Sequence, residues 1–116
     1  MKILGIGVDI IKNSRIRALI KKKSFIARSF GAKEVRFSKK VNNKVNYFSK
    51  RFAAKESFAK SLGTGFRKNL NLRDIEILND KLGKPYFFIS KKINNIINKK
   101  FKTKSYNLFL SISDEK

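Results

Sequence analysis

The sequence contains neither cysteine nor histidine. Without cysteine the protein has no disulfide, no thiol nucleophile and no cysteine-based zinc site. Without histidine it has no Ser-His-Asp or Cys-His nucleophile system, no histidine metal ligand and no histidine general base. It also lacks an apolar run near the roughly 18 residues that a membrane span needs, and its first residues lack the apolar segment of a secretory signal. We therefore expect a cytoplasmic protein without a membrane partner.

Acidic residues are scarce as well. Asp and Glu number 8 against 29 Lys and Arg, which gives a formal charge of +21. Such a field attracts polyanions, including nucleic acids, acidic proteins and phosphorylated small molecules. The abundance of Lys, Ile, Asn and Phe is also what an A/T-rich genome produces. The charge alone therefore does not decide between an RNA-binding protein and an enzyme with an acidic partner.

The 116 residues are enough for one domain with a single modest core. The β-branched run at 2–11 predicts a buried strand, in which Gly5 and Gly7 indicate a close approach of another backbone. The long helix expected at 46–62 ends at the glycines of 63–65. We expect an α+β fold, with further helices at 14–22, 25–30, 33–39 and 91–101 and strands at 73–79, 86–90 and 106–113.

Two carboxylates stand where a solvated charge is not expected. Asp9 interrupts the apolar strand, and Glu56 lies on the less polar side of the long helix, near Phe52 and Ala59. A buried lone carboxylate is costly unless it is paired or binds a metal. Without His or Cys, that metal would be a hard, oxygen-seeking ion such as Mg²⁺. The alternatives are that Asp9 caps the next helix and that Glu56 pairs with a basic neighbour.

Helical spacing places Phe52, Glu56, Lys60 and Gly63 along one face of the long helix. A carboxylate, an ammonium group and a glycine loop in a row could hold a metal and a phosphorylated ligand. The alternative is an ordinary ion pair between Glu56 and Lys60, followed by a glycine C-cap. The glycine elements at 63–65 and 83–85 could bind phosphate, but neither has the Walker spacing and each could be a simple turn.

Four segments, taken in order, closely resemble the holo-acyl-carrier-protein synthases, the small 4′-phosphopantetheinyl transferases of bacterial fatty-acid synthesis. The segments are 5–10, 50–65, 79–85 and 111–115, and the block Arg-Phe-Ala-Ala-Lys-Glu at 51–56 is highly specific. The resemblance implies a small antiparallel sheet packed with a long central helix. It also implies transfer of 4′-phosphopantetheine from coenzyme A to a serine of acyl carrier protein, with release of adenosine 3′,5′-bisphosphate. The implied assembly is a homotrimer with sites at the subunit boundaries.

The resemblance also assigns roles to residues. Asp9 and Glu56 would be the Mg²⁺ ligands, and Glu56 and Lys60 the catalytic residues. Glu56, a metal-bound water or another carboxylate could accept the serine proton. The coenzyme A site would comprise Arg51, Lys60, Gly63, Thr64, Gly65, Gly83, Lys84 and Pro85. The carrier protein, which is acidic, would dock on Arg15, Lys21, Lys22, Phe25 and Arg28.

The sequence departs from the family pattern in two places. Many relatives have His where Asp114 stands, and we assign Asp114 no binding role. Relatives also continue into a further strand of small apolar residues, whereas we expect residues 1–116 to form a single domain that lacks this strand. We expect the neighbouring strand to have an unpaired edge, which would weaken a trimer built on that sheet.

Two other functions are compatible with the sequence. One is a catalytically impaired relative that binds coenzyme A without transfer. The other is a small basic RNA-binding or ribosome-associated protein, which would stack bases on exposed aromatic residues such as Phe48 and Phe52. Helical spacing favours burial of these two residues. We expect coenzyme A and acyl carrier protein to be the partners, and not nucleic acid.

Overall fold

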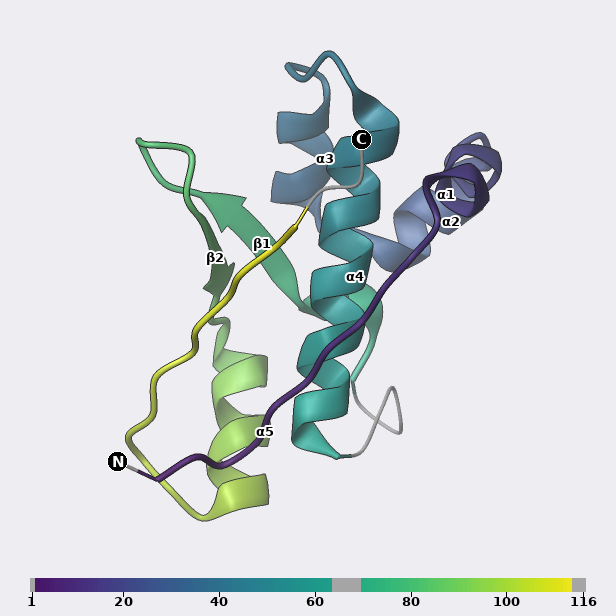
Figure 1. Cartoon of the computed structure of the whole chain (residues 1–116). Helices are drawn as coiled ribbons and strands as arrows, with labels where there is room; N and C mark the ends of the chain where they lie inside the picture. The colour runs from purple at the N-terminus through teal and green to yellow at the C-terminus, as the bar shows by residue number, and fades with distance from the viewer. Residues whose placement is uncertain (1, 64–69, 114–116) are drawn as a thin grey trace.

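The computed structural model describes residues 2–63 and 70–113. An α+β arrangement surrounds one long helix, α4, at the centre of the molecule (Figure 1). The elements in chain order are α1 (Asn13–Leu19), α2 (Lys23–Ser29), α3 (Ala32–Ser38), α4 (Lys44–Leu62), the 3₁₀ helix η1 (Leu72–Asp74), β1 (Glu76–Asn79), β2 (Pro85–Phe88) and α5 (Lys91–Phe101).

Helix α4 has a clear signal at each end. The Asn43 side chain accepts a hydrogen bond from the backbone N–H of Asn46 (3.0 Å) and so caps the first turn. At the other end Gly63 takes a left-handed conformation (φ 74°), which a residue without Cβ adopts at little cost. The prediction of a long helix that stops at Gly63 is confirmed.

Helix α4 separates two hydrophobic clusters and contributes to both. Its N-terminal half supplies aromatic side chains to a cluster that packs against α1 and α2. Its C-terminal half supplies Phe58 and Leu62 to a second cluster with β1 and α5. Since both clusters depend on α4, its orientation sets the position of nearly every other element. The first cluster comprises Ile16, Phe25, Phe30, Tyr47, Phe48 and Phe52, and the second Ala54, Phe58, Ala59, Leu62, Leu70, Ile75, Ile77, Ile93 and Ile97.

Strands β1 and β2 form an antiparallel hairpin in which Ile77 stands opposite Phe87. The connecting turn is held by Asp80, whose Oδ1 accepts hydrogen bonds from the backbone N–H groups of Leu82 and Lys84 (2.9 Å each). Gly83 supplies the positive φ (85°) that closes this turn. The predicted strand pair and its glycine turn are both present.

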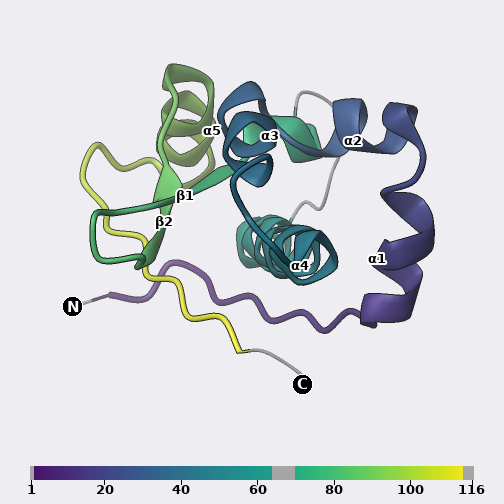
Figure 2. The ribbon, with the colours of Figure 1, turned by 90° about the horizontal axis from the view of Figure 1, so that it is seen from above.

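The strands expected at 2–11 and 106–113 are wrong as secondary structure. Both segments are extended, but neither forms a ladder with another described residue. They run along the same side of α4, one from the N-terminus towards α1 and the other from α5 towards the C-terminus (Figures 1 and 2). A strand needs a hydrogen-bonded neighbour, and the side chains of α4 that these segments contact do not provide one. Within residues 2–63 and 70–113, no helix is long and apolar enough to cross a bilayer.

Candidate active site

Two glycines bring the N-terminal segment directly onto helix α4. A Cβ atom on Gly5 would lie 2.1 Å from the carbonyl oxygen of Ser61, and one on Gly7 would lie 1.7 Å from that of Ser57. No side chain fits at such distances, so the segment reaches this depth only because both residues are glycine. The close backbone approach predicted for Gly5 and Gly7 is confirmed, and it brings the next residues of the segment against the same helix.

Asp9 follows these glycines and pairs with α4. The Lys60 ammonium donates to Asp9 Oδ1 (2.8 Å) and to the carbonyl oxygen of Val8 (3.1 Å). The hydrogen bond to Asp9 raises the pKa of Lys60 above its ordinary value, so this side chain stays cationic. Asp9 does not cap the next helix, because the N-cap of α1 is Lys12. The lysine on α4 therefore reaches the segment rather than its own helix neighbour Glu56, and the described ion pairs include none between Lys60 and Glu56.

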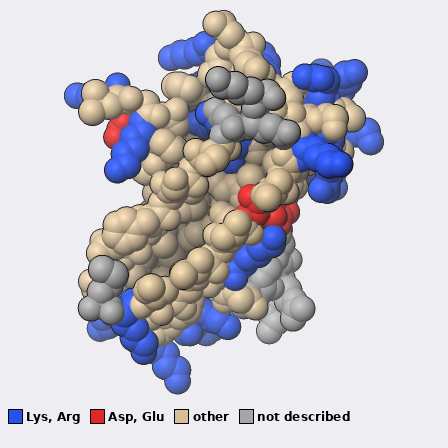
Figure 3. Space-filling model, in the orientation of Figure 1, with Lys and Arg blue, Asp and Glu red and all other residues tan. Residues whose placement is uncertain are grey.

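Glu56 lies on α4 one turn before Lys60, half-buried. Burial raises the pKa of its carboxyl, and the charge of Asp9 raises it further, while Lys60 and Arg15 act in the opposite direction. The two carboxylates are thus close enough to repel each other. Figure 3 shows a small acidic patch beside a basic side chain where the N-terminal segment crosses α4. The sequence prediction that Asp9 and Glu56 converge agrees with this placement.

This pair of carboxylates suits a hard divalent cation. Two negatively charged oxygen donors that lie close together gain by sharing a positive ion, and carboxylate oxygens are what Mg²⁺ prefers. Among residues 2–63 and 70–113, no group of three or more Asp, Glu, His or Cys side chains could hold a metal. A cation at Asp9 and Glu56 would therefore take its other ligands from a bound substrate and from water, as Mg²⁺ commonly does.

The residues predicted to line the coenzyme A site do not all meet in one chain. Gly63 ends α4 close to Lys60, whereas Thr64 and Gly65 lie outside the described residues. Gly83, Lys84 and Pro85 sit at the tip of the β1–β2 hairpin, which lies away from α1 in both views (Figures 1 and 2) and away from the N-terminal segment in Figure 1.

Arg51 is buried and already engaged inside the chain. Only 4% of it is exposed, one guanidinium nitrogen donates to Asn79 Oδ1 (2.7 Å), and the guanidinium lies over the Tyr47 ring at 3.7 Å. Arg51 thus ties α4 to the end of β1, near the hairpin tip. These contacts hold the hairpin in place, and the part of Arg51 in the coenzyme A site stays a prediction.

The predicted docking residues divide into a surface set and a core residue. Arg15, Lys21, Lys22 and Arg28 are exposed on α1, on α2 and between them. Phe25 is buried, with its ring 5.8 Å from Phe52 and 6.0 Å from Phe30 between centroids. The basic residues can meet an acidic protein, whereas Phe25 fastens α2 to the core beneath them.

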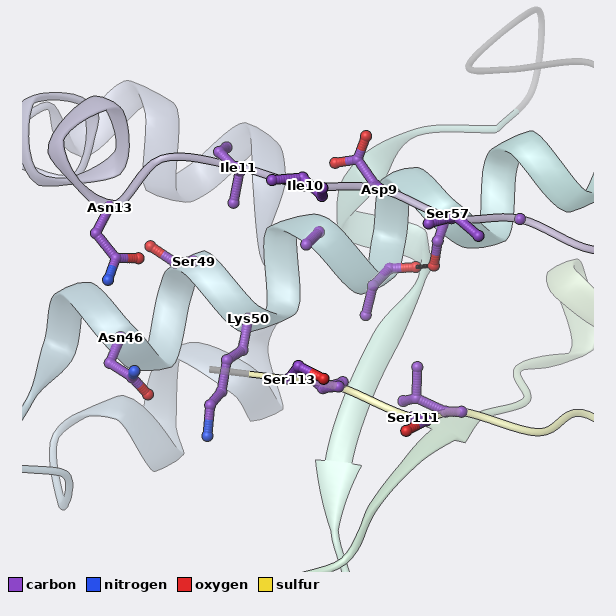
Figure 4. A pocket seen from close by; sticks show the side chains of 16 residues that line it. Asp9, Ile10, Ile11, Asn13, Asn46, Ser49, Lys50, Ser57, Ser111 and Ser113 are labelled. Atoms are coloured by element: carbon purple, nitrogen blue, oxygen red, sulfur yellow. Dashed lines mark hydrogen bonds between the residues drawn. The ribbon is translucent and has the colours of Figure 1, made fainter. Parts of the chain in front are cut away.

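A cavity of about 380 Å³ is lined by Asp9 and extends as far as Asn13, the first residue of α1 (Figure 4). It lies between the N-terminal segment, α4 and the C-terminal segment, and a second cavity of about 500 Å³ continues along the same two segments towards α5. Sequence reasoning did not anticipate this groove, because it placed both segments in a sheet. The polar residues that line the first cavity and are labelled in Figure 4 are Asp9, Asn13, Asn46, Ser49, Lys50, Ser57, Ser111 and Ser113.

The aromatic residues on which an RNA-binding function would depend are in the core. Phe48 is 4% exposed and Phe52 is 6% exposed. Neither ring can stack on a base, so the structure gives this alternative no support.

Comparisons with known proteins agree with the geometry. The family profile described as the 4′-phosphopantetheinyl transferase superfamily matches residues 5–110. A holo-[acyl-carrier-protein] synthase of Pelagibacter ubique is 58% identical over 116 residues, covering 100% of this chain and 91% of the relative. One of Clostridium beijerinckii is 46% identical over 112 residues, covering 96% of this chain and 87% of the relative.

Solved structures show the same fold. The holo-[acyl-carrier-protein] synthase of Neisseria meningitidis superposes with a TM-score of 0.78 at 40% identity, covering 84% of this chain and 80% of that one. The Bacillus anthracis enzyme, solved in complex with coenzyme A (3′,5′-ADP), gives a TM-score of 0.69 at 36% identity over 76% of each chain. With a profile match along most of its length and relatives this similar, the chain belongs to the 4′-phosphopantetheinyl transferase superfamily.

Proposed function

We propose that this protein transfers 4′-phosphopantetheine from coenzyme A to a serine of apo-acyl carrier protein, with release of adenosine 3′,5′-bisphosphate. The observation that carries the proposal is the meeting of Asp9 with Glu56 and Lys60, which lie in a distant part of the sequence. The relatives named as holo-[acyl-carrier-protein] synthases support the same reaction. The cytoplasm, where coenzyme A and the carrier protein are both present, is the proposed location.

Asp9 and Glu56 would hold Mg²⁺ in this proposal. Bound there, the ion would neutralise the diphosphate of coenzyme A and stabilise the charge that develops on its leaving phosphate. Lys60 would stay cationic beside the same diphosphate, because its hydrogen bond to Asp9 raises its pKa. Positioning and charge stabilisation account for most of the catalysis of phosphoryl transfer, so a site without His or Cys is adequate. Glu56, whose pKa is raised, is a candidate acceptor for the serine proton.

We also propose that the site is completed between subunits of a homotrimer. The hairpin tip with Gly83, Lys84 and Pro85 lies away from the N-terminal segment within one chain (Figure 1), so a second copy is needed to bring the two parts together. Large apolar side chains on the N-terminal segment support an interface there, since Ile6, Val8 and Ile10 are 71%, 70% and 89% exposed. Thr64 and Gly65 stay part of the proposed coenzyme A site.

We propose that the described residues form a single phosphopantetheinyl transferase domain. The two extended segments on either side of the groove have no ladder partners among the described residues, so their backbone edges are free of strand pairing within the described part of the chain. Sedimentation velocity would measure the assembly directly: we expect a trimer that dissociates on dilution, and a monomer at all concentrations would contradict the homotrimer.

Transfer is tested by the intact mass of a carrier protein. Incubation of apo-acyl carrier protein with coenzyme A, Mg²⁺ and this protein should add one phosphopantetheine group to each carrier. Glu56→Gln should abolish the mass gain, whereas Asp74→Asn should keep it, because Asp74 pairs with Lys92 away from the site. The absence of any mass gain with saturating substrates would overturn the proposal. Binding of coenzyme A without transfer would indicate the impaired relative instead.

A further inference from the structure

An ion pair is completely buried directly behind the candidate site. Lys55 on α4 and Glu34 on α3 each have 0% of their side chains exposed, and their charged atoms Nζ and Oε1 are 2.5 Å apart. Lys55 immediately precedes Glu56 in the sequence. Neither Lys55 nor Glu34 takes part in the reaction proposed above, and neither can touch a substrate from this position.

The Lys55 ammonium uses all three of its donors, and both carboxylate oxygens of Glu34 accept hydrogen bonds. The Lys55 ammonium donates its three hydrogens to Glu34 Oε1 and to the carbonyl oxygens of Leu72 (3.1 Å) and Ile75. Glu34 Oε1 also accepts from the backbone N–H of Gly31 (3.0 Å), and Oε2 accepts from that of Ile77 (3.1 Å). The pair therefore joins α4 to α3, to η1 and to β1 at one point.

A buried ion pair of this kind contributes little to stability beyond what apolar side chains would give. Removing two charges from water is costly, and well-packed apolar residues of the same volume often stabilise a core as well or better. Hydrogen bonds, in contrast to apolar contacts, have a preferred direction and length. The pair therefore fixes how far α4 is rotated about its own axis and where it lies along that axis, relative to the elements around it.

The rotation of α4 decides where the site residues point. Successive residues on an α-helix are about 100° apart around its axis, so the direction of Lys55 sets the direction of Glu56. Lys60 lies one turn beyond Glu56 and reaches Asp9 from the same helix. On the other side, the N-terminal segment is fixed by its glycines against the α4 backbone. A helix free to rotate would move Glu56 and Lys60 relative to Asp9.

We infer that the Glu34–Lys55 pair is a positioning device for the active site, which holds α4 at the rotation that sets Glu56 and Lys60 against Asp9. This inference rests on the proposed function for the roles of Glu56 and Asp9. It differs from a purely structural role in one measurable respect: a folded protein without the pair should still have an impaired site.

The test is a double variant, Glu34→Gln/Lys55→Met, which removes both charges and keeps the volume close to the original. Its folding is followed by circular dichroism, and its site by the affinity for Mn²⁺ in electron paramagnetic resonance and by kcat and KM for carrier modification. Losing an outer partner of a metal site commonly costs about 10- to 100-fold in metal affinity or activity, and we expect losses of that size in Mn²⁺ affinity and in kcat. The KM for coenzyme A should change less than kcat.

A second readout needs neither metal nor activity. The hydrogen bond between Lys60 and Asp9 can be followed in the metal-free protein by nuclear magnetic resonance of the lysine ammonium, and it should weaken in the double variant. Ile93→Ala is the control, because it opens the core at α5 and leaves the pair intact; its folded fraction should keep the wild-type kcat and Mn²⁺ affinity. A double variant that folds and keeps both values would overturn the inference.

Two further outcomes remain decisive. If the double variant does not fold, the single variant Glu34→Gln decides: it keeps the shape and one acceptor oxygen, and it should lower kcat and Mn²⁺ affinity in the same direction. If the wild-type protein binds no Mn²⁺, the metal assignment of the proposed function fails. The positioning role is then decided by the Lys60 resonance and by kcat.

Discussion

Glu56 combines a functional role with an energetic cost. Its pKa is raised chiefly by burial and then by Asp9, so the folded chain keeps its proton to a higher pH than the unfolded chain does. The stability that this group contributes is therefore present at acidic pH. It is lost as the pH rises from the ordinary pKa of glutamate through the raised pKa of Glu56 in the folded chain. At neutral pH, without metal, the ionised carboxylate opposes folding.

Glu56→Gln should accordingly be more stable than the parent at pH 7 in the presence of a chelator, while transfer is abolished. The stability difference should shrink below the ordinary pKa of glutamate, because both side chains are then neutral. Urea unfolding at pH 4 and pH 7 measures both effects. A variant that is less stable at pH 7, or that retains turnover, would show that Glu56 does not have this role.

Adding even one methyl group at Gly7 should reduce both the stability and the activity of the protein. Gly7→Ala places a methyl group 1.7 Å from the Ser57 carbonyl oxygen, so the segment must move away from α4. We expect a loss of about 1–3 kcal/mol in unfolding free energy, the usual cost of overpacking, together with a clear loss of kcat because Asp9 moves with the segment. Lys2→Ala, on the same segment but exposed, is the control. Full activity in Gly7→Ala would contradict the placement of Asp9.

At the scale of single residues, the sequence predicted the close approach of the N-terminal segment to α4 but missed the support behind it. Glycines in an apolar run indicated the close approach, and two misplaced acids indicated the site. Glu34 and Lys55 were not identified, although a signal was present. Lys55 falls in the apolar stripe of Phe48, Phe52, Ala59 and Leu62, where a charge needs a buried partner. Which acid supplies that partner depends on tertiary packing and cannot be deduced from spacing.

The elements differ in how far local sequence determined them. The helix at 91–101 has the predicted bounds, and α4 begins two residues before the expected 46. Helices satisfy their own hydrogen bonds, so their periodicity and end signals are local. The segments 2–11 and 106–113 have strand-like sequences, yet a strand requires a partner elsewhere in the fold. That requirement explains why the helices were predicted more accurately than the outer strands.

The N-cap of α4 allows a test at the scale of an element. Asn43→Ala removes the side-chain oxygen that caps the first turn, which should lower the unfolding free energy by about 1 kcal/mol. The transfer activity of the folded protein should stay unchanged, because α4 is held further along its length by Lys55. Asn42→Ala, one residue earlier, is the control. Chemical denaturation gives the first quantity and steady-state kinetics the second; a fall in kcat with Asn43→Ala would mean that the cap also positions the site.

The whole molecule carries a formal charge of +21, and this field should govern its encounter with an acidic carrier protein. The KM for the carrier should rise with NaCl concentration while kcat stays nearly constant, because screening acts on association. Initial rates over a range of salt concentrations measure this. A KM that does not depend on salt would argue against electrostatic docking.

The position of the basic residues should matter in addition to their number. The pair Lys21→Glu/Lys22→Glu changes charge on the proposed docking surface, and Lys99→Glu/Lys100→Glu makes the same change at the end of α5. We expect the first pair to raise the KM for the carrier far more than the second. Equal effects would show that only the net charge matters and that the docking surface lies elsewhere.

The close seating of the N-terminal segment on α4 also bears on how the protein is made. During translation this segment leaves the ribosome well before the helix on which it rests, so Gly5 and Gly7 have no α4 backbone to pack against until α4 has formed. The nascent chain therefore passes through a stage in which apolar, strand-like sequence is not yet seated on the fold and can meet chaperones and other nascent chains. Slow elongation through the residues of α4 would prolong this stage and lower the yield of active enzyme.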